Sequence, residues 1–280
     1  MQMNRIGLII SFLILFSLFF SCKNEKKLID TESVGEVVVV ETVYTDILQQ
    51  IEVNIYSAED IVFNGHKFNQ KQLKSSCATI SIIPFDSVTW PKTITVDFGS
   101  SNCMGDDGRN RRGKILINST GRYKDTTTVL TVTFDNYYLS NNKISGTATV
   151  ANQGVNKAGY REYKIAVQNG IIETPKGLIN WQFSGAKQWV NGTITPWPVN
   201  GDDVFIHTGN ASGTFTDGTY FNADIIKLLI TATACPWISS GTIEININQK
   251  NIGTLDFGDN TCDSIATVVV DGESYGVGLK

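Results

Sequence analysis

The sequence has few of the residues on which catalytic and metal sites depend. Only 2 of its 280 residues are histidines, His66 and His207, and neither lies in a zinc-binding spacing. The sequence also lacks a Gly-x-Ser-x-Gly segment, a phosphate-binding loop and a dinucleotide-binding fingerprint. We therefore expect no enzymatic activity and no cofactor. The alternative is a pair of carboxylates that meet only in the folded chain.

Proline and positive charge are also in short supply. The 6 prolines argue against a disordered stalk. Lys and Arg number 23 against 27 Asp and Glu, which gives a formal net charge of −4. Because proteins that bind the phosphates of nucleic acid need a basic face, nucleic acid is not an expected partner.

The N-terminus has the features of an export signal. Arg5 precedes an apolar run, Ile6–Phe20, that ends at Ser21 and Cys22 and gives way to a polar segment. At 15 residues the run is shorter than the roughly 20 that a membrane-spanning helix needs. The Ser21-Cys22 pair resembles the lipobox of bacterial lipoproteins. We therefore expect residues 1–21 to be a lipoprotein signal peptide and Cys22 to carry acyl chains that anchor the protein to a membrane. An ordinary signal followed by a chance cysteine is the alternative.

The residues after Cys22 bear on the destination of the protein. Lys23 stands where an aspartate would retain a lipoprotein in the inner membrane, so the resemblance implies a lipid anchor in the outer membrane. Glu25 is the only acid among the next few residues, which makes a poor match to the acidic tag of surface-exposed Bacteroidota lipoproteins. The sequence leaves open whether the protein faces the cell surface or the periplasm.

The other four cysteines form two pairs with similar spacing. Cys77 and Cys103 are 26 residues apart, Cys235 and Cys262 are 27 apart, and the second cysteine of each pair ends an Asp-Phe-Gly-x-x-x-Cys motif. Each pair flanks a segment that reads as a β-hairpin, whose two ends lie close together. We therefore predict one disulfide within each pair, as is usual for exported proteins. A metal site, the alternative, would need closer cysteines or a nearby histidine.

Strand-like segments occupy most of the chain after Cys77. Thr127–Phe134 alternates between two faces, and the first hairpin has strand segments at Ala78–Ile83 and Thr93–Phe98. Further candidate strands are Lys143–Val150, Tyr163–Val167, Gly177–Phe183, Val204–His207, Asp224–Ala234, Thr242–Asn248 and Ile252–Phe257. Since no long helical segments separate them, we expect an all-β fold, either an antiparallel β-sandwich or an extended, curled antiparallel sheet.

One short helix is expected near the N-terminus. Apolar residues on one helical face predict a helix over residues 46–63, whereas Val37–Val40 has the composition of a strand. The predicted organisation is a signal peptide (1–21), a polar tether (22–45) and a β-rich domain (46–280) with two Cys-stapled hairpin units at about 76–118 and 234–280.

A charged segment in the first of these units is a possible ligand-binding loop. Its charged residues are Asp106, Asp107, Arg109, Arg111 and Arg112. The guanidinium groups could bind a phosphate or an acidic sugar. The simpler interpretation is a solvated loop in which the two aspartates pair with the arginines.

Two further groups of residues are weaker candidates. Asp256, Asp259, Asn260 and Asp263 supply oxygen atoms of the kind that Ca²⁺ binds, but not in the spacing of an EF-hand, so no metal is expected. Aromatic residues could form a stacking platform for sugars, or fill the core as they more often do in β proteins. These are Trp90, Trp181, Trp189, Trp197, Trp237, Tyr137 and Tyr138.

Several motifs together resemble a family of uncharacterised Bacteroidota outer-membrane lipoproteins. They are Asp97–Gly99, Gly108–Ile115, Thr120–Tyr123, Thr133–Tyr138, Cys235–Thr242 and Asp256–Asp263. The resemblance implies a lineage and a compartment but no activity. We expect a non-enzymatic binding or structural role in the cell envelope. The alternatives are a glycan-capture subunit or glycan-active hydrolase, and a periplasmic lipid or lipoprotein carrier with an apolar concave sheet face.

Overall fold

The computed structural model describes residues 31–64, 78–195, 201–270 and 272–279. The helix α1 (Thr31–Glu59) continues into a short π-helical turn, η1 (Asp60–Asn64). The strands are β1 (Thr79–Ile83), β2 (Lys92–Asp97), β3 (Cys103–Met104), β4 (Asn110–Ser119), β5 (Val129–Leu139), β6 (Asn142–Val155), β7 (Arg161–Thr174), β8 (Gly177–Asn191), β9 (Val204–Thr214), β10 (Tyr220–Ala232), β11 (Cys235–Ile247), β12 (Lys250–Asp259), β13 (Ile265–Val270) and β14 (Glu273–Gly278).

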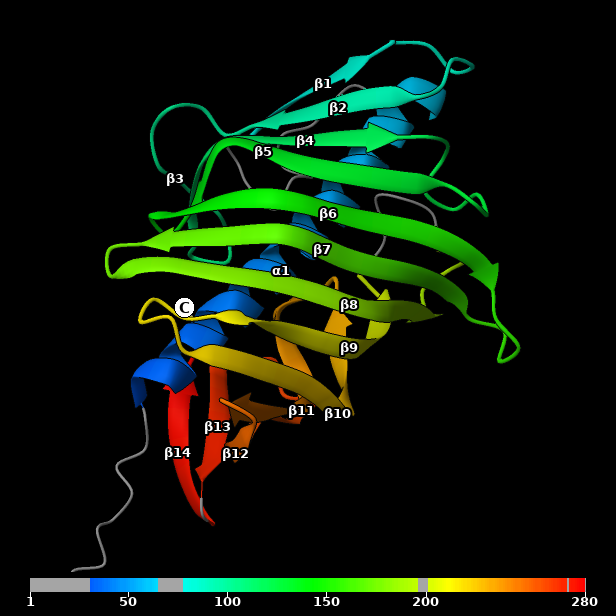
Figure 1. Ribbon diagram of the computed structural model, residues 1–280. Coiled ribbons are helices and arrows are strands. Elements are labelled where there is room, and N and C mark those ends of the chain that lie inside the picture. Colours follow the sequence, from blue (N-terminus) through cyan, green and yellow to red (C-terminus); the bar gives the residue numbers. More distant parts are fainter. Residues whose placement is uncertain (1–30, 65–77, 196–200, 271, 280) are drawn as a thin grey trace, which may run out of the picture.

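All of these strands belong to one antiparallel sheet. The strands pair in sequence order from β1 at one end to β14 at the other, except that β2 pairs with β4 and β3 pairs only with β4, so the 14 strands form an open meander. The sheet curls around α1, with β5 to β10 on one side of the helix and β11 to β14 turned back beneath it (Figure 1). The expected antiparallel β fold is confirmed in its extended, curled form.

The helix α1 forms the centre of the core. Every side chain from Val43 to Ala58 is buried, whereas an ordinary surface helix exposes one face to solvent. Aromatic residues of the sheet pack directly on the helix: the ring centroids of Tyr44 and Phe183 are 4.3 Å apart. The described helix is not apolar enough over any stretch to cross a membrane.

The helix begins earlier than the sequence predicts. Residues 31–45, which we assigned to the polar tether, are helical, and Val37–Val40 is part of α1 and not of a strand. β-Branched residues are only modestly unfavourable in helices. Burial of Val37, Val38 and Val40 against the rest of the core outweighs that preference.

Both predicted hairpins are present. Strands β1 and β2 pair from Thr79 opposite Asp97 to Ile83 opposite Thr93. Strands β11 and β12 are joined by Asn248 and Gln249, which both adopt positive φ angles, 48° and 66°. Two such residues in succession are typical of the tight type I′ turn, whose twist matches that of the strands it joins.

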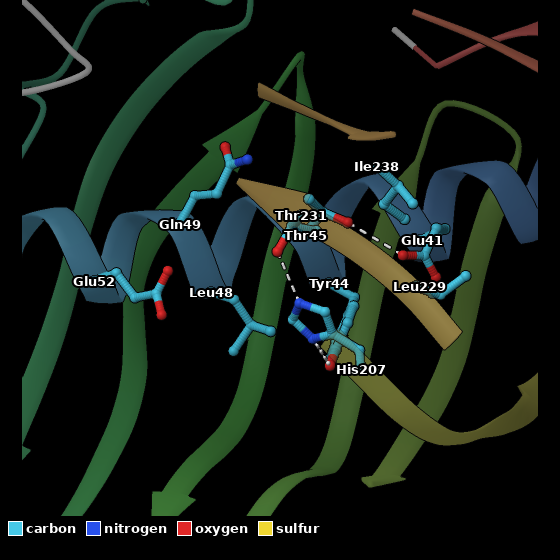
Figure 2. A pocket seen from close by; sticks show the side chains of 10 residues that line it. All are labelled: Glu41, Tyr44, Thr45, Leu48, Gln49, Glu52, His207, Leu229, Thr231 and Ile238. Carbon is cyan, nitrogen blue, oxygen red and sulfur yellow. Dashed lines mark hydrogen bonds between the residues drawn. The ribbon is translucent and has the colours of Figure 1, made fainter. Parts of the chain in front are cut away.

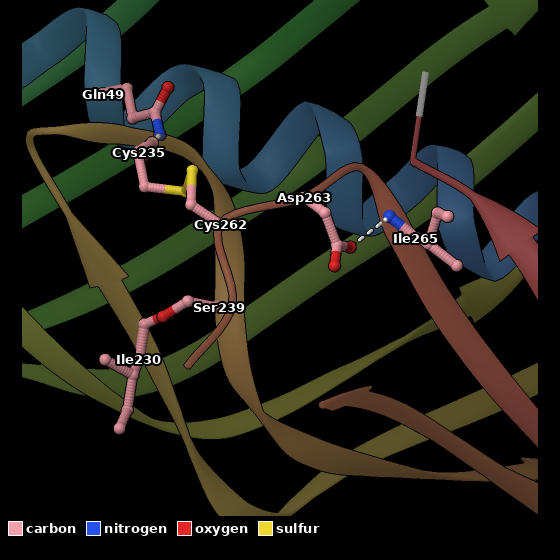
Figure 3. The surroundings of a disulfide bond; sticks show 7 residues. All are labelled: Gln49, Ile230, Cys235, Ser239, Cys262, Asp263 and Ile265. Atoms are coloured by element: carbon pink, nitrogen blue, oxygen red, sulfur yellow. Dashed lines mark hydrogen bonds between the residues drawn. A yellow bond between two sulfur atoms is a disulfide. The ribbon is translucent and has the colours of Figure 1, made fainter. Parts of the chain in front are cut away.

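The predicted disulfide in the second unit is confirmed. Cys235 and Cys262 are bonded, with their Cα atoms 5.8 Å apart (Figure 3). Cys235 lies at the start of β11, and its carbonyl oxygen accepts a hydrogen bond of 3.5 Å from Gln49 of α1, so the disulfide lies next to the central helix. Cys103 in β3 is also disulfide-bonded. Its predicted partner, Cys77, lies outside the described residues.

A pair of glycines leaves room for an aromatic ring that packs on the helix. Gly185 and Gly209 face each other on β8 and β9, and a Cβ atom on Gly185 would lie 2.1 Å from the Thr208 carbonyl oxygen. A Cβ atom on either glycine would also meet the ring of Phe183, at 2.7 and 2.8 Å. The ring therefore covers backbone that has no side chains of its own, and Tyr44 of α1 packs on that ring.

Candidate functional site

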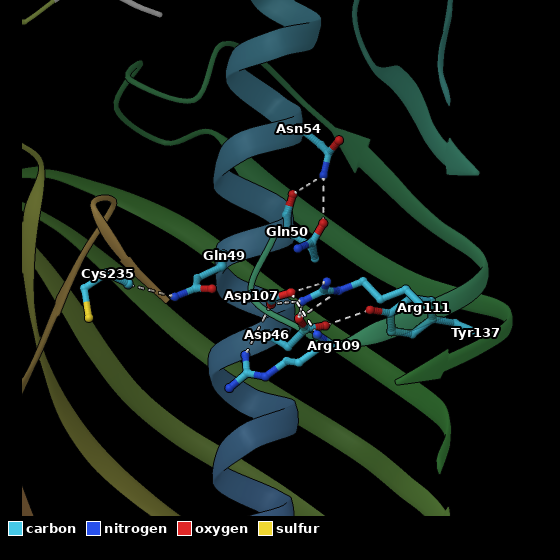
Figure 4. A network of polar contacts seen from close by, with 9 residues as sticks. All are labelled: Asp46, Gln49, Gln50, Asn54, Asp107, Arg109, Arg111, Tyr137 and Cys235. Carbon is cyan, nitrogen blue, oxygen red and sulfur yellow. Dashed lines mark hydrogen bonds and ion pairs between the residues drawn. The ribbon is translucent and has the colours of Figure 1, made fainter. Parts of the chain in front are cut away.

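The charged segment that we considered as a possible ligand-binding loop, or more simply as a solvated loop, contributes to a buried ion-pair network. Arg111 lies in β4, and its guanidinium is fully buried. It donates hydrogen bonds to Asp46 of α1, one of them 3.0 Å long from Nε, and to Asp107 at 3.0 and 2.5 Å (Figure 4). Tyr137 donates a further hydrogen bond of 2.7 Å to Asp46. The aspartate–arginine pairing is present, but its location in the core corrects the expectation of a solvated loop.

The other arginines of this segment differ in their surroundings. Arg109 is also buried: its guanidinium stacks on Trp237 at 4.5 Å and lies 3.9 Å from a carboxylate oxygen of Asp107. Burial lowers the pKa of Arg109, against the opposing effect of the nearby aspartates. Arg112 is partly exposed and stacks on Tyr138 at 3.6 Å, and Asp106 is exposed. The buried part of the segment holds two aspartates and two arginines, counting Asp46, and so has no net charge with which to attract an anion.

A second buried pair joins α1 to β8. Lys187 donates hydrogen bonds to Glu52 of α1 and, at 2.8 Å, to the hydroxyl of Tyr123. The Tyr123 hydroxyl donates in turn to Glu52 at 3.2 Å. Burial lowers the pKa of Lys187, and the Glu52 carboxylate opposes that effect. Near the end of the helix, Glu59 accepts a 2.6 Å hydrogen bond from the Tyr123 amide, and burial raises the pKa of Glu59 to about 7.

These two ion pairs fix how α1 is rotated within the sheet. Asp46 and Glu52 are six residues apart, a separation of about 9 Å along the helix axis, and each pairs with a different strand. Removing one member of such a pair leaves an uncompensated buried charge, which costs about 3 to 5 kcal/mol. The charged groups are therefore used to hold the helix in place.

A small polar cavity lies between α1 and strands β9 to β11. His207 is buried there, with Nδ1 3.4 Å from the Tyr44 hydroxyl and Nε2 2.8 Å from Thr231 Oγ1 (Figure 2). Burial, with a smaller effect from Lys187, lowers the pKa of His207 to about 3. Glu41 accepts a 3.1 Å hydrogen bond from Thr45, and its pKa is raised to about 7 because the surrounding protein desolvates the carboxylate.

This cavity has the groups for acid–base chemistry but no room for a substrate. Glu41, Glu52 and His207 all line it, yet its volume is about 10 Å³. A volume of this size holds roughly one water molecule. The amide oxygen of Gln49, which also lines the cavity, is buried and has no hydrogen-bond partner within the described protein. One buried water would satisfy that oxygen.

The candidate calcium ligands cap turns. Asp256 accepts hydrogen bonds from the Gly258 amide at 2.9 Å and the Thr242 hydroxyl at 2.8 Å. Asp263 accepts one from the Ile265 amide at 2.9 Å, and Asn260 adopts a positive φ of 75°. Within the described ranges, no three His, Cys, Asp or Glu side chains converge as metal ligands.

The tryptophans do not form a platform in the described part of the chain. Trp181 and Trp189 are buried in the core, Trp90 and Trp237 are half-buried and far apart in the sequence, and Trp197 lies outside the described residues. Tyr137 is fully buried in the ion-pair network. The core-filling interpretation holds for Trp181, Trp189 and Tyr137.

A larger depression lies on the outer face of the sheet. Its volume is about 360 Å³, and its lining residues come from β7, β8, β9 and β10. These four strands lie side by side in the sheet (Figure 1). Since Trp181 and Phe183 of β8 point inward, Asn180 and Gln182 point outward. The lining residues are all uncharged: Asn169, Gly170, Ile171, Asn180, Trp181, Gln182, Ser212, Gly213, Thr214 and Tyr220.

The sequence contained one signal for this depression. Polar residues occupy every second position at Asn180, Gln182 and Ser184 of β8, and again at Asn210, Ser212 and Thr214 of β9. This alternation marks an outward face of each strand. The alternation does not show which residues of β8 lie opposite which residues of β9. The depression depends on this register between the strands.

Comparison of the chain with protein-family models, with curated proteins and with solved structures finds no match in any of the three.

Proposed function

We propose that the protein is a lipid-anchored, non-enzymatic binding protein of the bacterial cell envelope. The observation that carries this proposal is where the charged groups lie. Buried acids and bases pair between α1 and the sheet, next to a cavity of about 10 Å³, whereas the depression of about 360 Å³ is lined by neutral side chains. A hydrolase needs its acid and base groups on the cavity that admits the substrate.

The carrier alternative is disfavoured by the position of α1. A lipid carrier of this shape would need an empty, apolar concave face on the sheet. In this protein the helix occupies the concave side (Figure 1). Its Asp46 carboxylate is paired with Arg111 of the sheet (Figure 4), and its Glu52 carboxylate is paired with Lys187. Vacating that space for an acyl chain would break both buried ion pairs, at a cost of about 3 to 5 kcal/mol for each.

The proposed anchor fits a role close to the membrane. Eight residues separate Cys22 from Thr31, where the described part of the helix starts. A chain of this length spans at most about 28 Å, so acyl chains on Cys22 would keep the folded body near the bilayer. A rigid body held at this distance suits capture of a ligand at the envelope.

Metabolic labelling tests the anchor. Cells expressing the full chain are fed an alkyne-bearing fatty acid, and the protein is recovered from the outer-membrane fraction. We expect label on the wild type and none on Cys22→Ser, which should accumulate without membrane association. Wild-type protein that is processed, unlabelled and absent from membranes would overturn the proposal.

Protease shaving of intact cells then determines which face the protein occupies. Peptides from residues 78–280 released without permeabilisation would place the binding surface outside the cell. Release only after permeabilisation would place it in the periplasm.

A further inference from the structure

We infer that the outer-face depression over β7 to β10 binds a neutral oligosaccharide. This inference rests on the proposed binding function and names the class of ligand. The evidence is the arrangement of uncharged hydrogen-bonding groups on β8, β9 and β10, together with one exposed aromatic ring at the end of the array.

The hydrogen-bonding groups form two rows that cross three neighbouring strands. The register places Asn180, Thr214 and Tyr220 in one row, and Gln182, Ser212 and Asn222 in the next. Adjacent strands are about 4.8 Å apart and the two rows about 6.8 Å apart, so the array covers an area of the order of one or two sugar rings.

In each row, a hydrogen bond between two side chains of the protein fixes which groups remain free to donate and which remain free to accept. Asn180 Nδ2 donates to Thr214 Oγ1 at 3.3 Å, and Gln182 Nε2 donates to Ser212 Oγ at 3.1 Å. A hydroxyl that accepts from an amide has its own proton left to donate, and the amide oxygen remains an acceptor. Among the described residues neither hydroxyl proton has an acceptor. Ser212 is only 6% exposed, but both hydroxyl residues line the depression, so each row presents a donor next to an acceptor there. Sugar hydroxyl groups, which both donate and accept, match this pattern.

Tyr220 supplies an apolar surface beside the polar rows. Its side chain is 44% exposed at the start of β10, and the residue lines the same depression. An aromatic ring with a polar tip can contact the C–H face of a sugar while its hydroxyl stays hydrated. An apolar ligand would leave the hydrogen-bonding groups of the array without partners, and a purely ionic ligand would make no use of the apolar ring.

The charge distribution argues for a neutral ligand. The next row along the strands contains Asp224, whose carboxylate accepts hydrogen bonds from Asn210 at 2.8 Å and from Asn222. No Lys or Arg lines the depression. An acidic sugar or a phosphate would therefore meet a carboxylate and no compensating cation.

The array is also rigid before a ligand arrives. It lies on strands that are paired on both sides, and the amides are held by cross-strand bonds. A preorganised surface loses little side-chain entropy on binding. Weak individual hydrogen bonds can then add up to measurable affinity.

The test uses the full chain purified from whole cells in detergent, whether or not it is membrane-bound. It is applied to an array of neutral and acidic oligosaccharides, and the affinity for the best neutral hit is measured by calorimetry. We expect binding to neutral members and no preference for sialylated or sulfated ones. The double variant Asn180→Ala/Gln182→Ala removes the two amides from exposed positions, and loss of two hydrogen bonds should weaken binding by about 10-fold or more.

The matched control is Asn118→Ala, which removes an exposed amide from the outer face of β4. It should change the affinity by less than about 2-fold, and all variants should keep the wild-type melting temperature. Binding that survives Asn180→Ala/Gln182→Ala, binding to acidic glycans alone, or no binding to any neutral oligosaccharide would each overturn the inference. The proposed function is judged separately by the acylation of Cys22, so the two can fail independently.

Discussion

The carboxylate of Asp46 on α1 and the guanidinium of Arg111 on β4 are both fully buried and pair with each other across the core. The hydroxyl of Tyr137 completes the hydrogen bonding of the carboxylate, at 2.7 Å. The ionic groups of this core thus hold the helix in a fixed position relative to the sheet.

Arg111→Met should destabilise the protein by about 3 to 5 kcal/mol, because it leaves the Asp46 carboxylate buried without its positively charged partner. Chemical denaturation followed by circular dichroism measures this change. The control Arg112→Met removes a partly exposed arginine from the same strand and should cost less than about 1 kcal/mol. Asp46→Leu/Arg111→Met, which removes both charges, should be more stable than Arg111→Met alone. Equal losses for Arg111→Met and Arg112→Met would contradict the assigned role of the pair.

His207→Gln should make the protein less sensitive to acid. The folded protein keeps His207 neutral down to its pKa of about 3, whereas the ordinary value is 6.5. The unfolded chain therefore takes up a proton first. The contribution of this site to stability is complete above pH 6.5 and is lost as the pH falls toward 3. Between pH 6.5 and 4 the wild type should lose about 2 to 3 kcal/mol more than His207→Gln in urea titrations at a series of pH values. Parallel curves for the two proteins would refute the low pKa.

Glu59→Gln should change the pH dependence of stability in the opposite direction, with its effect at high pH. The pKa of Glu59 is raised from 4.5 to about 7, so the folded state holds the proton more tightly than the unfolded state. Its contribution is complete below pH 4.5 and is lost as the pH rises toward 7. The variant, whose amide oxygen can still accept the Tyr123 amide proton, should be about 1 to 2 kcal/mol more stable than the wild type at pH 8, after allowance for partial solvent screening. The difference should disappear at pH 4. A variant that is less stable at both pH values would mean that the carboxylate is charged in the folded protein.

Removal of the Cys235–Cys262 disulfide should lower the free energy of unfolding by about 3 to 4 kcal/mol, the chain-entropy value for a loop closed over 27 residues. The paired change Cys235→Ser/Cys262→Ser tests this by thermal and urea unfolding. Intact mass after thiol alkylation without reductant provides the independent check. Alkylation of both cysteines in native wild-type protein would show that the bond is not formed.

Much of the fold follows from local patterns in the sequence. The hairpin of β11 and β12 could be predicted because strand-like segments flank a short turn and because the spacing of Cys235 and Cys262 matches that of the first cysteine pair. The predicted strands left residues 249–251 for the turn, whereas Asn248 and Gln249 form it, and both strands are longer than predicted. Open sheet and sandwich could not be distinguished, because both have the same alternation along each strand.

The central helix and the ion pairs could not be predicted in the same way. Val37–Val40 has the composition of a strand, and only contacts from distant strands make it helical. Lys187 and Arg111 occupy inward positions that alternation would assign to apolar side chains. Their partners lie 135 and 65 residues away in the chain, a separation that no local pattern reports. The outer-face depression depends on register in the same way, because its two rows come from three strands.

The buried acids of α1 also have a consequence during export. The helix precedes its partner strands in the chain, so the buried ion pairs of Asp46 and Glu52 can form only after long stretches of sheet have emerged. The 29-residue helix is buried on every side from Val43 to Ala58, and a helix of this length, if wholly apolar, would partition into the bilayer like a membrane anchor. Each carboxylate near its middle opposes that partitioning by about 3 kcal/mol. Asp46 and Glu52 thus disfavour insertion of the emerging segment into the lipid until Arg111 and Lys187 have been exported and can pair with them.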